Sequence, residues 1–176
     1  MKHIIFFLLA LVTFDVAHAA PKYIAVNEND TCISNFALMK GLLPLPCSGS
    51  ATIMKHFGDD RIEGSQDSVI TSKGLVLKIE SGNDVEAIYN GIVSSVFSFK
   101  GKAGVIIRHG EYLSVYFGMA KICVSKGETV KTHQQIGTLG KDKTLDFQVR
   151  HNTEPLNPEE WLKPIINSVY SNQKVS

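Results

Sequence analysis

Residues 101–140, GKAGVIIRHGEYLSVYFGMAKICVSKGETVKTHQQIGTLG, decide the fold of this chain. An apolar run at 105–107 stops at the turn-forming segment 108–111, and the next residues alternate in character. Leu113, Val115 and Phe117 fall on one face, and Tyr112, Ser114 and Tyr116 fall on the other. A period of two over this length predicts a β-hairpin with one face in a core. Glycine-containing turns and shorter strands complete the stretch.

The β pattern continues on the N-terminal side of this hairpin. Apolar runs predict strands at 52–58, 68–71, 74–79, 85–88 and 92–97, with a turn at Asn90 and Gly91, whereas the charged residues 59–67 predict a loop. We therefore expect a mostly antiparallel β domain over 51–150.

Helix is expected only in two short pieces, at 34–40 and at 158–166. Asn157 and Pro158 supply a helix start, because Asn is a favoured N-cap and Pro a favoured first helical residue. A helix at this place would bury Trp161 against the sheet.

Length and charge limit the classes of function. The chain has 176 residues and a formal net charge of +1, so one domain is expected. The balanced charge gives no reason to expect a nucleic acid or an anionic membrane surface as partner.

The N-terminal segment has the features of an export signal. Lys2 and His3 precede an apolar run that is too short to span a bilayer, and residues 17–19 (AHA) place small residues at the two positions a signal peptidase reads. We expect a signal peptide at 1–19 and an exported, soluble periplasmic or cell-envelope protein without stable membrane insertion. The expected divisions are an N-terminal arm with a short helix at 20–40, a domain at 41–163 and a tail at 164–176.

The three cysteines are compatible with two arrangements. In an oxidising compartment Cys32 and Cys47 can form a disulfide, whereas three free cysteines are the alternative. Cys123 lies between Ile122 and Val124, which predicts a buried strand thiol.

The order of several segments resembles the LytM or lysostaphin type of peptidoglycan endopeptidase domain. The similar segments are KGLLPLPCSGS, HFGDD, SKGLVLKIESGNDVEAIYNGIVSSV, the hairpin stretch, TLDFQVR and LNPEEWL, which together span about 40–162. The chain looks most similar to the C-terminal domains of murein hydrolase activators such as EnvC. The resemblance implies an antiparallel β-sandwich of the duplicated-hybrid-motif type, with a groove across one sheet. Two echoing segments, GNDVEAIYNGIV and GETVKTHQQIGTL, fit such a duplicated motif.

An active member of the resembled family holds zinc with the His and Asp of an H-x-x-x-D strand and the second His of an H-x-H strand. In this sequence Ser72 and Val76 stand at the first two positions, and Asp146 stands at the third. Two assisting histidines are replaced by Thr144 and Gly118. One carboxylate is too few ligands for zinc, so we expect no metal and no cofactor.

No other group of residues restores the site. His56 and Asp60 make a literal H-x-x-x-D, but the chain has no H-x-H to complete it. His109, His133 and His151 fall on different predicted elements, so no composite site is expected. Neither a Ser–His–acid motif nor a Cys–His pair at Cys123 is recognisable.

The prediction is therefore an inactive LytM-like domain that binds a partner. The expected partner is a cell-wall hydrolase such as an amidase, with peptidoglycan as the second choice. The expected groove lining is Ser72, Val76, Tyr112, Ser114, Tyr116, Gly118, Thr144, Asp146 and Gln148. The alternative is a zinc metalloendopeptidase that cleaves peptidoglycan cross-bridges with non-standard ligands. A lipoyl- or biotin-carrier-like module is a third, weaker alternative.

Overall fold

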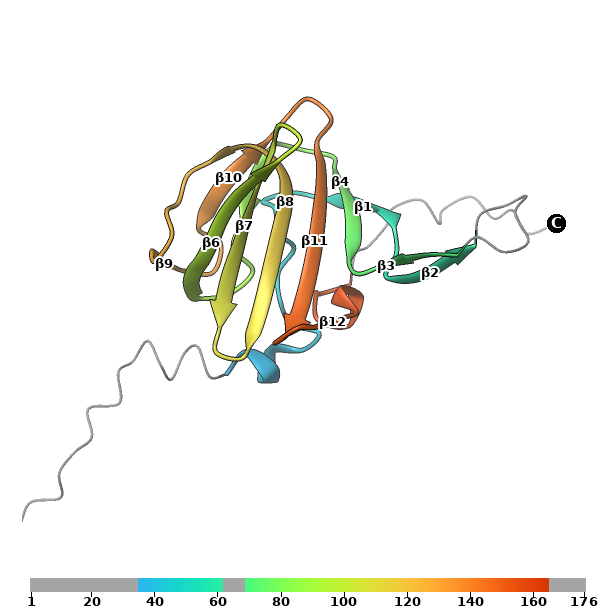
Figure 1. Cartoon of the computed structure of the whole chain (residues 1–176), viewed down its shortest axis with the longest axis horizontal. Coiled ribbons are helices and arrows are strands. Elements are labelled where there is room, and N and C mark those ends of the chain that lie inside the picture. The colour runs from blue at the N-terminus through green and yellow to red at the C-terminus, as the bar shows by residue number, and fades with distance from the viewer. Residues whose placement is uncertain (1–34, 62–68, 165–176) are drawn as a thin grey trace, which may run out of the picture.

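The computed structural model describes residues 35–61 and 69–164, and it is mainly antiparallel β-structure, as predicted (Figure 1). The elements in chain order are η1 (Phe36–Met39), β1 (Ala51–Lys55), β2 (Gly58–Arg61), β3 (Val69–Ser72), β4 (Leu75–Ile79), β5 (Asp84–Glu86), β6 (Gly91–Phe99), β7 (Lys102–His109), β8 (Tyr112–Ile122), β9 (Thr129–Val130), β10 (Gln135–Leu139), β11 (Thr144–His151), β12 (Glu154–Leu156) and η2 (Pro158–Glu160).

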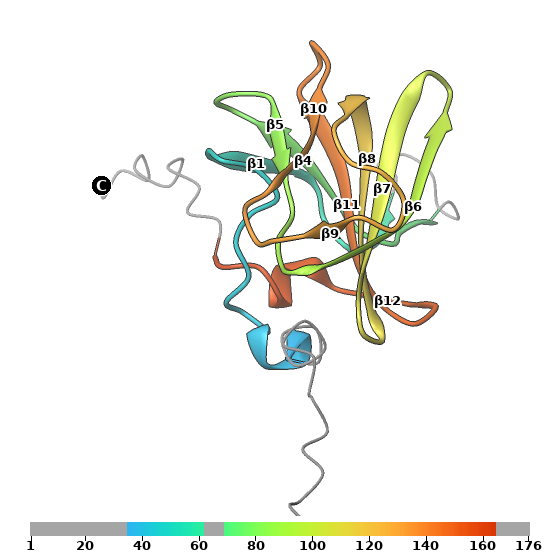
Figure 2. The ribbon, with the colours of Figure 1, turned by 90° about the vertical axis from the view of Figure 1, so that its left-hand side faces the viewer.

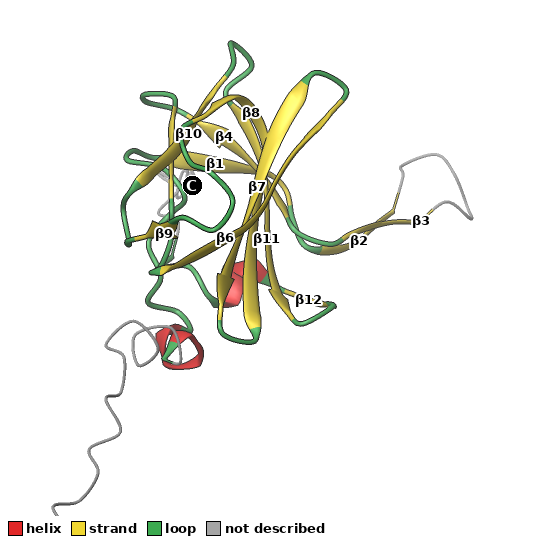
Figure 3. Cartoon of the chain, turned by 60° about the vertical axis from the view of Figure 1, so that its left-hand side comes forward, coloured by secondary structure: helices red, strands yellow, loops and turns green. Residues whose placement is uncertain are grey.

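One large sheet organises the described residues. Its main path runs β1-β4-β11-β8-β7-β6-β9, and β10 pairs with both β8 and β5. Figure 2 shows β5, β9 and β10 on one side of the β7–β8–β11 part, so the sheet folds over a shared core. The two layers expected of a sandwich are therefore regions of a single curved sheet. β2 and β3 form a separate hairpin that projects from the body (Figure 3).

Strand alternation decides which side chains enter the core. Odd-numbered residues of β4 and of β11 up to Val149, such as Leu77 and Phe147, are buried, whereas their even-numbered neighbours Val76 and Asp146 are half-buried on the opposite face. The largest fully buried side chains are Tyr116, Phe36, Phe147, Leu43, Leu75, Leu77, Ile79, Ile88, Ile107, Met119, Ile136 and Leu145.

The helical pieces are shorter than the sequence pattern predicts. Both η1 and η2 are single 3-10 turns, and the predicted helix beyond residue 164 lies outside the described residues. Trp161 is buried, as expected, and Phe36 of η1 stacks on it with ring centroids 5.2 Å apart. The predicted arm therefore contributes Phe36 to the core.

Two strand predictions need correction. The predicted strand at 52–58 is interrupted, because β1 ends at Lys55 and β2 begins at Gly58. β2 also takes the first residues of the predicted loop at 59–67, where Asp59 pairs with Thr71 of β3.

Candidate functional site

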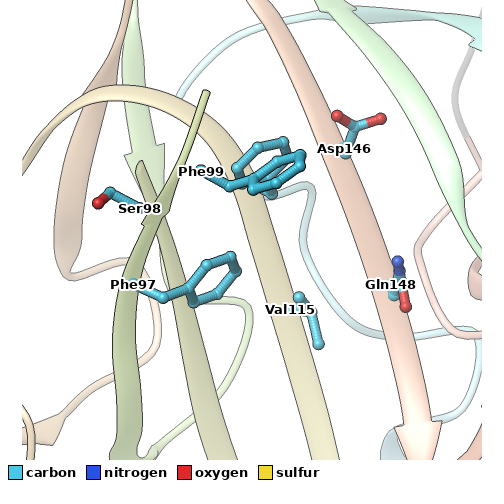
Figure 4. A pocket seen from close by; sticks show the side chains of 7 residues that line it. Phe97, Ser98, Phe99, Val115, Asp146 and Gln148 are labelled. Atoms are coloured by element: carbon cyan, nitrogen blue, oxygen red, sulfur yellow. The ribbon is translucent and has the colours of Figure 1, made fainter. Parts of the chain in front are cut away.

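A groove of about 510 Å³ lies on the open face of the sheet, opposite the core (Figure 4). Its lining comes from β6, β8 and β11 and consists of Phe97, Ser98, Phe99, Val115, Phe117, Asp146 and Gln148. Figure 4 shows the rings of Phe97 and Phe99 directed across the groove toward the side of Asp146 and Gln148. The groove thus has an aromatic wall and a partly polar floor.

Cross-strand pairing builds the floor. Asp146 of β11 lies opposite Val76 of β4 on one side and opposite Phe117 of β8 on the other. One step along, Gln148 lies opposite Val115. These pairs share a face, so the one carboxylate that lines the groove among the described residues is flanked by two apolar side chains.

The aromatic wall depends on a glycine in the middle strand. Gly104 of β7 pairs with Phe97 of β6 and with Phe117 of β8. A Cβ at Gly104 would lie 2.3 Å from Cζ of Phe97, so the missing side chain leaves room for this ring. The rings of Phe97 and Phe117 therefore stack across β7, with centroids 5.9 Å apart and planes 7° apart.

The structure brings together some of the predicted metal-ligand positions. Val76 and Asp146 are cross-strand neighbours on the groove face, and Thr144 lies two residues before Asp146 on the same strand. The hydroxyls of Ser72 and Thr144 donate instead to the carbonyls of Gly74 at 2.8 Å and Asp142 at 3.0 Å. Gly118 has φ +113°, and a Cβ there would lie 2.7 Å from the Thr144 carbonyl oxygen.

These side chains do not fit a zinc ion. Val76 and Gly118 have no ligand atom, and one carboxylate is too few for the tetrahedral sites that zinc prefers. Across residues 35–61 and 69–164, no three His, Cys, Asp or Glu side chains are grouped so that they could hold a metal ion.

Asp146 is half-buried and makes no hydrogen bond or ion pair with any described residue. Desolvation raises the pKa of its carboxyl group, and the charge of Lys102 opposes this shift. Lys102 itself is bonded to Asp142, with its Nζ 2.6 Å from Oδ2. The groove thus contains a carboxylate whose nearby cation is already paired.

Of the nine predicted lining residues, only Asp146 and Gln148 line the groove, and the prediction for β8 is wrong about which face is open. Ser114 and Tyr116 are fully buried in the core, and Tyr112 is half-buried against Phe36 and Trp161. The groove face of β8 is the opposite one, with Val115 and Phe117. Hydroxyl groups enter the core here because they find hydrogen-bond partners inside it.

A buried polar chain supplies these partners. Nδ1 of His109 lies 2.7 Å from the Asn90 carbonyl oxygen, and Nε2 lies 2.8 Å from Oγ of Ser114. A carbonyl only accepts, so Nδ1 carries the proton and Ser114 donates to Nε2. The amide of Ile88 donates to the Tyr116 hydroxyl at 3.0 Å.

The Ser114–His109 pair was not expected from the sequence, but both residues are buried, which denies a substrate access. Burial lowers the pKa of His109 to about 4 and raises the pKa of Tyr116 to about 12. The pair is therefore a structural element of the core.

Within residues 35–61 and 69–164, three further histidines each lie beside a different glutamate and do not line the groove. His56 contacts Glu159 at 3.0 Å, His133 contacts Glu86 at 3.1 Å and His151 contacts Glu111 at 3.3 Å. The side chain of Asp60 lies outside the described part of the chain.

The cysteines give one correction. Cys123 is exposed, because it follows the end of β8 at Ile122 and is not inside a strand. Cys47 is buried, and its Sγ lies 3.5 Å from the Gly49 carbonyl oxygen. Cys32 lies outside the described residues, so the Cys32–Cys47 disulfide stays a prediction.

The antiparallel fold and the position of the groove restrict the class of protein, and a comparison with protein families identifies it. The model of Peptidase family M23 matches residues 71–158, and the chain belongs to this family. The resemblance seen in the sequence is thereby confirmed at the level of the family, while the likeness to EnvC stays a prediction.

Two curated relatives contain a similar segment. The chain is 31% identical over 150 residues to the uncharacterized protein NMB1333 of Neisseria meningitidis serogroup B, covering 82% of this chain and 23% of the relative. It is 30% identical over 129 residues to an uncharacterized metalloprotease of Haemophilus influenzae, covering 69% of this chain and 27% of the relative. The chain thus spans about a quarter of the length of these relatives.

Solved structures share the fold. Helicobacter pylori Csd3 superposes with a TM-score of 0.60 at 25% identity, over 71% of this chain and 36% of Csd3. A chain of the SpoIIQ–SpoIIIAH pore-forming complex gives 0.59 at 21% identity, over 77% of this chain and 99% of that one. A zinc-containing peptidase from Vibrio cholerae gives 0.57 at 23% identity, over 71% and 40%. None of the helices in the described residues is long and apolar enough to cross a membrane.

Proposed function

We propose that this chain is an exported, catalytically inactive M23 domain whose groove binds a partner protein in cell-wall remodelling. The partner class is a cell-wall hydrolase such as an amidase, which the domain would activate. One observation supports this proposal above the others. Where an active relative needs three zinc ligands, the groove presents the single carboxylate of Asp146 between Val76 and Phe117.

The composition of the groove supports binding. Stacked aromatic rings offer rigid apolar contact area, and Asp146 and Gln148 add hydrogen-bonding groups beside them. Aromatic residues with a few polar neighbours are typical of protein interfaces. One of the structurally similar chains was solved as part of a protein–protein complex, that of SpoIIQ and SpoIIIAH.

Metal and activity measurements test the inactive part of the proposal. We expect purified protein to contain no stoichiometric zinc and to release no fragments from peptidoglycan. One zinc per chain, lost together with hydrolysis in Asp146→Asn, would establish the zinc endopeptidase instead.

The placement of the lost ligands has its own test. The combined substitutions Ser72→His, Val76→Asp and Asp146→His restore the family pattern, and we expect at least weak zinc binding to appear. Calorimetric titration with zinc showing no binding by a folded triple variant would contradict the assignment of these positions.

Capture from envelope extract tests the binding part. Val115→Arg places a long charged side chain in the groove, and we expect it to abolish capture of a hydrolase. Met54→Arg is the matched control, because Met54 is 64% exposed on β1 and does not line the groove. If the Val115→Arg variant still captures the hydrolase, binding takes place elsewhere on the domain. If the wild type captures only peptidoglycan, the cell wall itself is the ligand.

A further inference from the structure

One row of residues crosses the open face of the sheet. Asp146 of β11 lies opposite Phe117 of β8. Phe117 lies opposite Gly104 of β7, which in turn lies opposite Phe97 of β6. Residues directly opposite each other on neighbouring strands share a face of the sheet. Because Gly104 has no side chain, the Phe97 ring occupies its place and stacks on Phe117, so the row joins a carboxylate to a continuous aromatic surface.

The carboxylate and the aromatic rings border the same open space. The groove of about 510 Å³ is lined by Asp146, Phe97, Phe99 and Phe117 together (Figure 4). The Cβ atoms of directly opposite residues are about 5 Å apart, so a group that binds the Asp146 carboxylate also lies beside the Phe117 ring. The groove therefore offers a single ligand group both an anion and an aromatic surface.

The charge of Asp146 is not paired within the described part of the chain. Its carboxylate makes no hydrogen bond or ion pair with any described residue. Lys102 is the cation whose charge acts on Asp146, but its Nζ lies 2.6 Å from Oδ2 of Asp142. Half-burial removes part of the hydration of the carboxylate without supplying a bond in its place. A cation from outside the domain would supply that bond.

The aromatic wall already attracts one ammonium group. Nζ of Lys100 lies 5.3 Å from the centroid of the Phe99 ring, which is within the range of cation–π attraction. Lys100 belongs to the turn between β6 and β7 and does not line the groove, so it leaves the carboxylate of Asp146 without a partner. The wall thus adds a second attraction for a cation beside the charge of Asp146.

We propose that the groove recognises its partner protein through one cationic side chain, a lysine or an arginine that pairs with Asp146 beside the stacked rings of Phe97 and Phe117. The aliphatic stem of this side chain packs over Val115, while its charged end bonds to the carboxylate. An acidic side chain would be repelled at this place, and an apolar one would leave the carboxylate desolvated and unpaired. This inference rests on the proposed binding function of the groove and specifies which side chain of the partner it recognises.

Blocked amino acids supply defined probes for this side chain. We choose the N-acetyl methylamides of lysine, arginine, norleucine and glutamate, which differ only in the side chain. The valine methyl signals of purified, methyl-labelled protein report binding by NMR, because Val115 lines the groove, and Val115→Ile identifies its signals by their absence. We expect the lysine and arginine probes to bind about fivefold more tightly than norleucine, and the glutamate probe to bind most weakly.

Two variants separate the contributions of the carboxylate and the ring. Asp146→Asn should reduce binding of the lysine probe to the level of norleucine and leave norleucine binding unchanged. Glu111→Gln is the matched control, because it removes the same charge from a side chain that is 77% exposed and does not line the groove. Phe99→Leu keeps an apolar group on a side chain that is 59% exposed, and it should weaken binding of lysine more than binding of norleucine.

Four results would overturn this inference. They are the absence of a Val115 shift with the lysine probe, equal binding of lysine and norleucine, a lysine preference that survives Asp146→Asn, and displacement of the lysine probe by soluble peptidoglycan fragments but not by a captured hydrolase. The last result would make the wall the source of the cation. Envelope capture separates this inference from the proposed function. Capture of the hydrolase by Asp146→Asn but not by Val115→Arg refutes only the cation, whereas capture by both variants refutes binding in the groove as well.

Discussion

Acidification should destabilise the domain through one buried residue, His109. Its ring is 1% exposed, stacks on Phe36 with centroids 4.6 Å apart and uses both nitrogens in hydrogen bonds to uncharged partners. Protonation would place a second donor against Ser114 and a charge inside the core. The pKa of His109 is accordingly lowered by burial from 6.5 to about 4.

The sign and size of the pH effect on stability follow from the difference between the pKa of His109 in the unfolded and in the folded chain. Above about pH 7 the ring is neutral in both states, so it contributes no pH dependence. Between 6.5 and 4 the unfolded chain binds a proton that the folded chain does not, so stability falls as the pH falls. The pKa difference between 6.5 and about 4 corresponds to a loss of about 3 kcal/mol in the free energy of unfolding, at 1.36 kcal/mol per pKa unit.

Urea unfolding at pH 7, 6, 5 and 4 measures this loss. Carboxyl groups add their own pH dependence, so the informative quantity is the difference between the wild type and His109→Gln. We expect His109→Gln to be less stable at pH 7, because it loses the ring stacking, yet to have a flatter profile down to pH 4.

Equal slopes for the wild type and His109→Gln would refute the reasoning. That result would mean that His109 is protonated in the folded state at the same pH as in the unfolded chain. The buried chain from Asn90 to Ser114 would then not have the proton positions assigned to it.

Three other substitutions test the core and the groove. Gly104→Ala should cost about 1 kcal/mol in thermal unfolding, because its Cβ displaces the Phe97 ring and breaks the aromatic stack; an unchanged melting temperature would contradict this role. Tyr116→Phe should lower the free energy of unfolding in urea by about 1–3 kcal/mol, because the buried Ile88 amide loses its acceptor; a neutral effect would show that another acceptor replaces it. Asp146→Asn should leave stability at pH 7 unchanged or higher, and any gain should vanish below pH 4, since desolvation raises the pKa of this carboxyl group; a clear loss at pH 7 would mean that Asp146 supports the fold.

The fold was predictable because its signals are local. The alternation of 112–117 and the turn at 108–111 depend only on neighbouring residues, and both are confirmed in β7 and β8. The same is true of the capping residue Asn157, whose side chain accepts from the Glu159 amide at 3.1 Å. The lengths of the helical segments were less predictable, because tertiary packing ends η1 and η2 after one turn.

The face of β8 that forms the groove could not be read from the sequence. A period of two separates two faces but does not say which one is buried. Ser114 enters the core only because His109 of β7 and its partner Asn90, in the loop before β6, are placed there. Likewise, the aromatic wall requires Phe97 to lean across Gly104 from a neighbouring strand, and only the sheet register shows this. The missed signal was the glycine itself, which lies within an apolar strand without a turn to explain it.

Asp146 occupies one of the family's ligand positions and also lines the groove. A half-buried carboxylate without a bonded partner destabilises the free domain, so stability alone gives no reason to keep it. Its cross-strand neighbours Val76 and Phe117 have no ligand atoms, so they offer the carboxylate no shared metal ion. The charge of Lys102 offsets its desolvation in part, and a cation bound in the groove beside the aromatic stack would offset it further. If Asp146→Asn stabilises the free chain and weakens capture of a partner from envelope extract, the charge is retained for binding; if it does neither, the groove does not select for a cation.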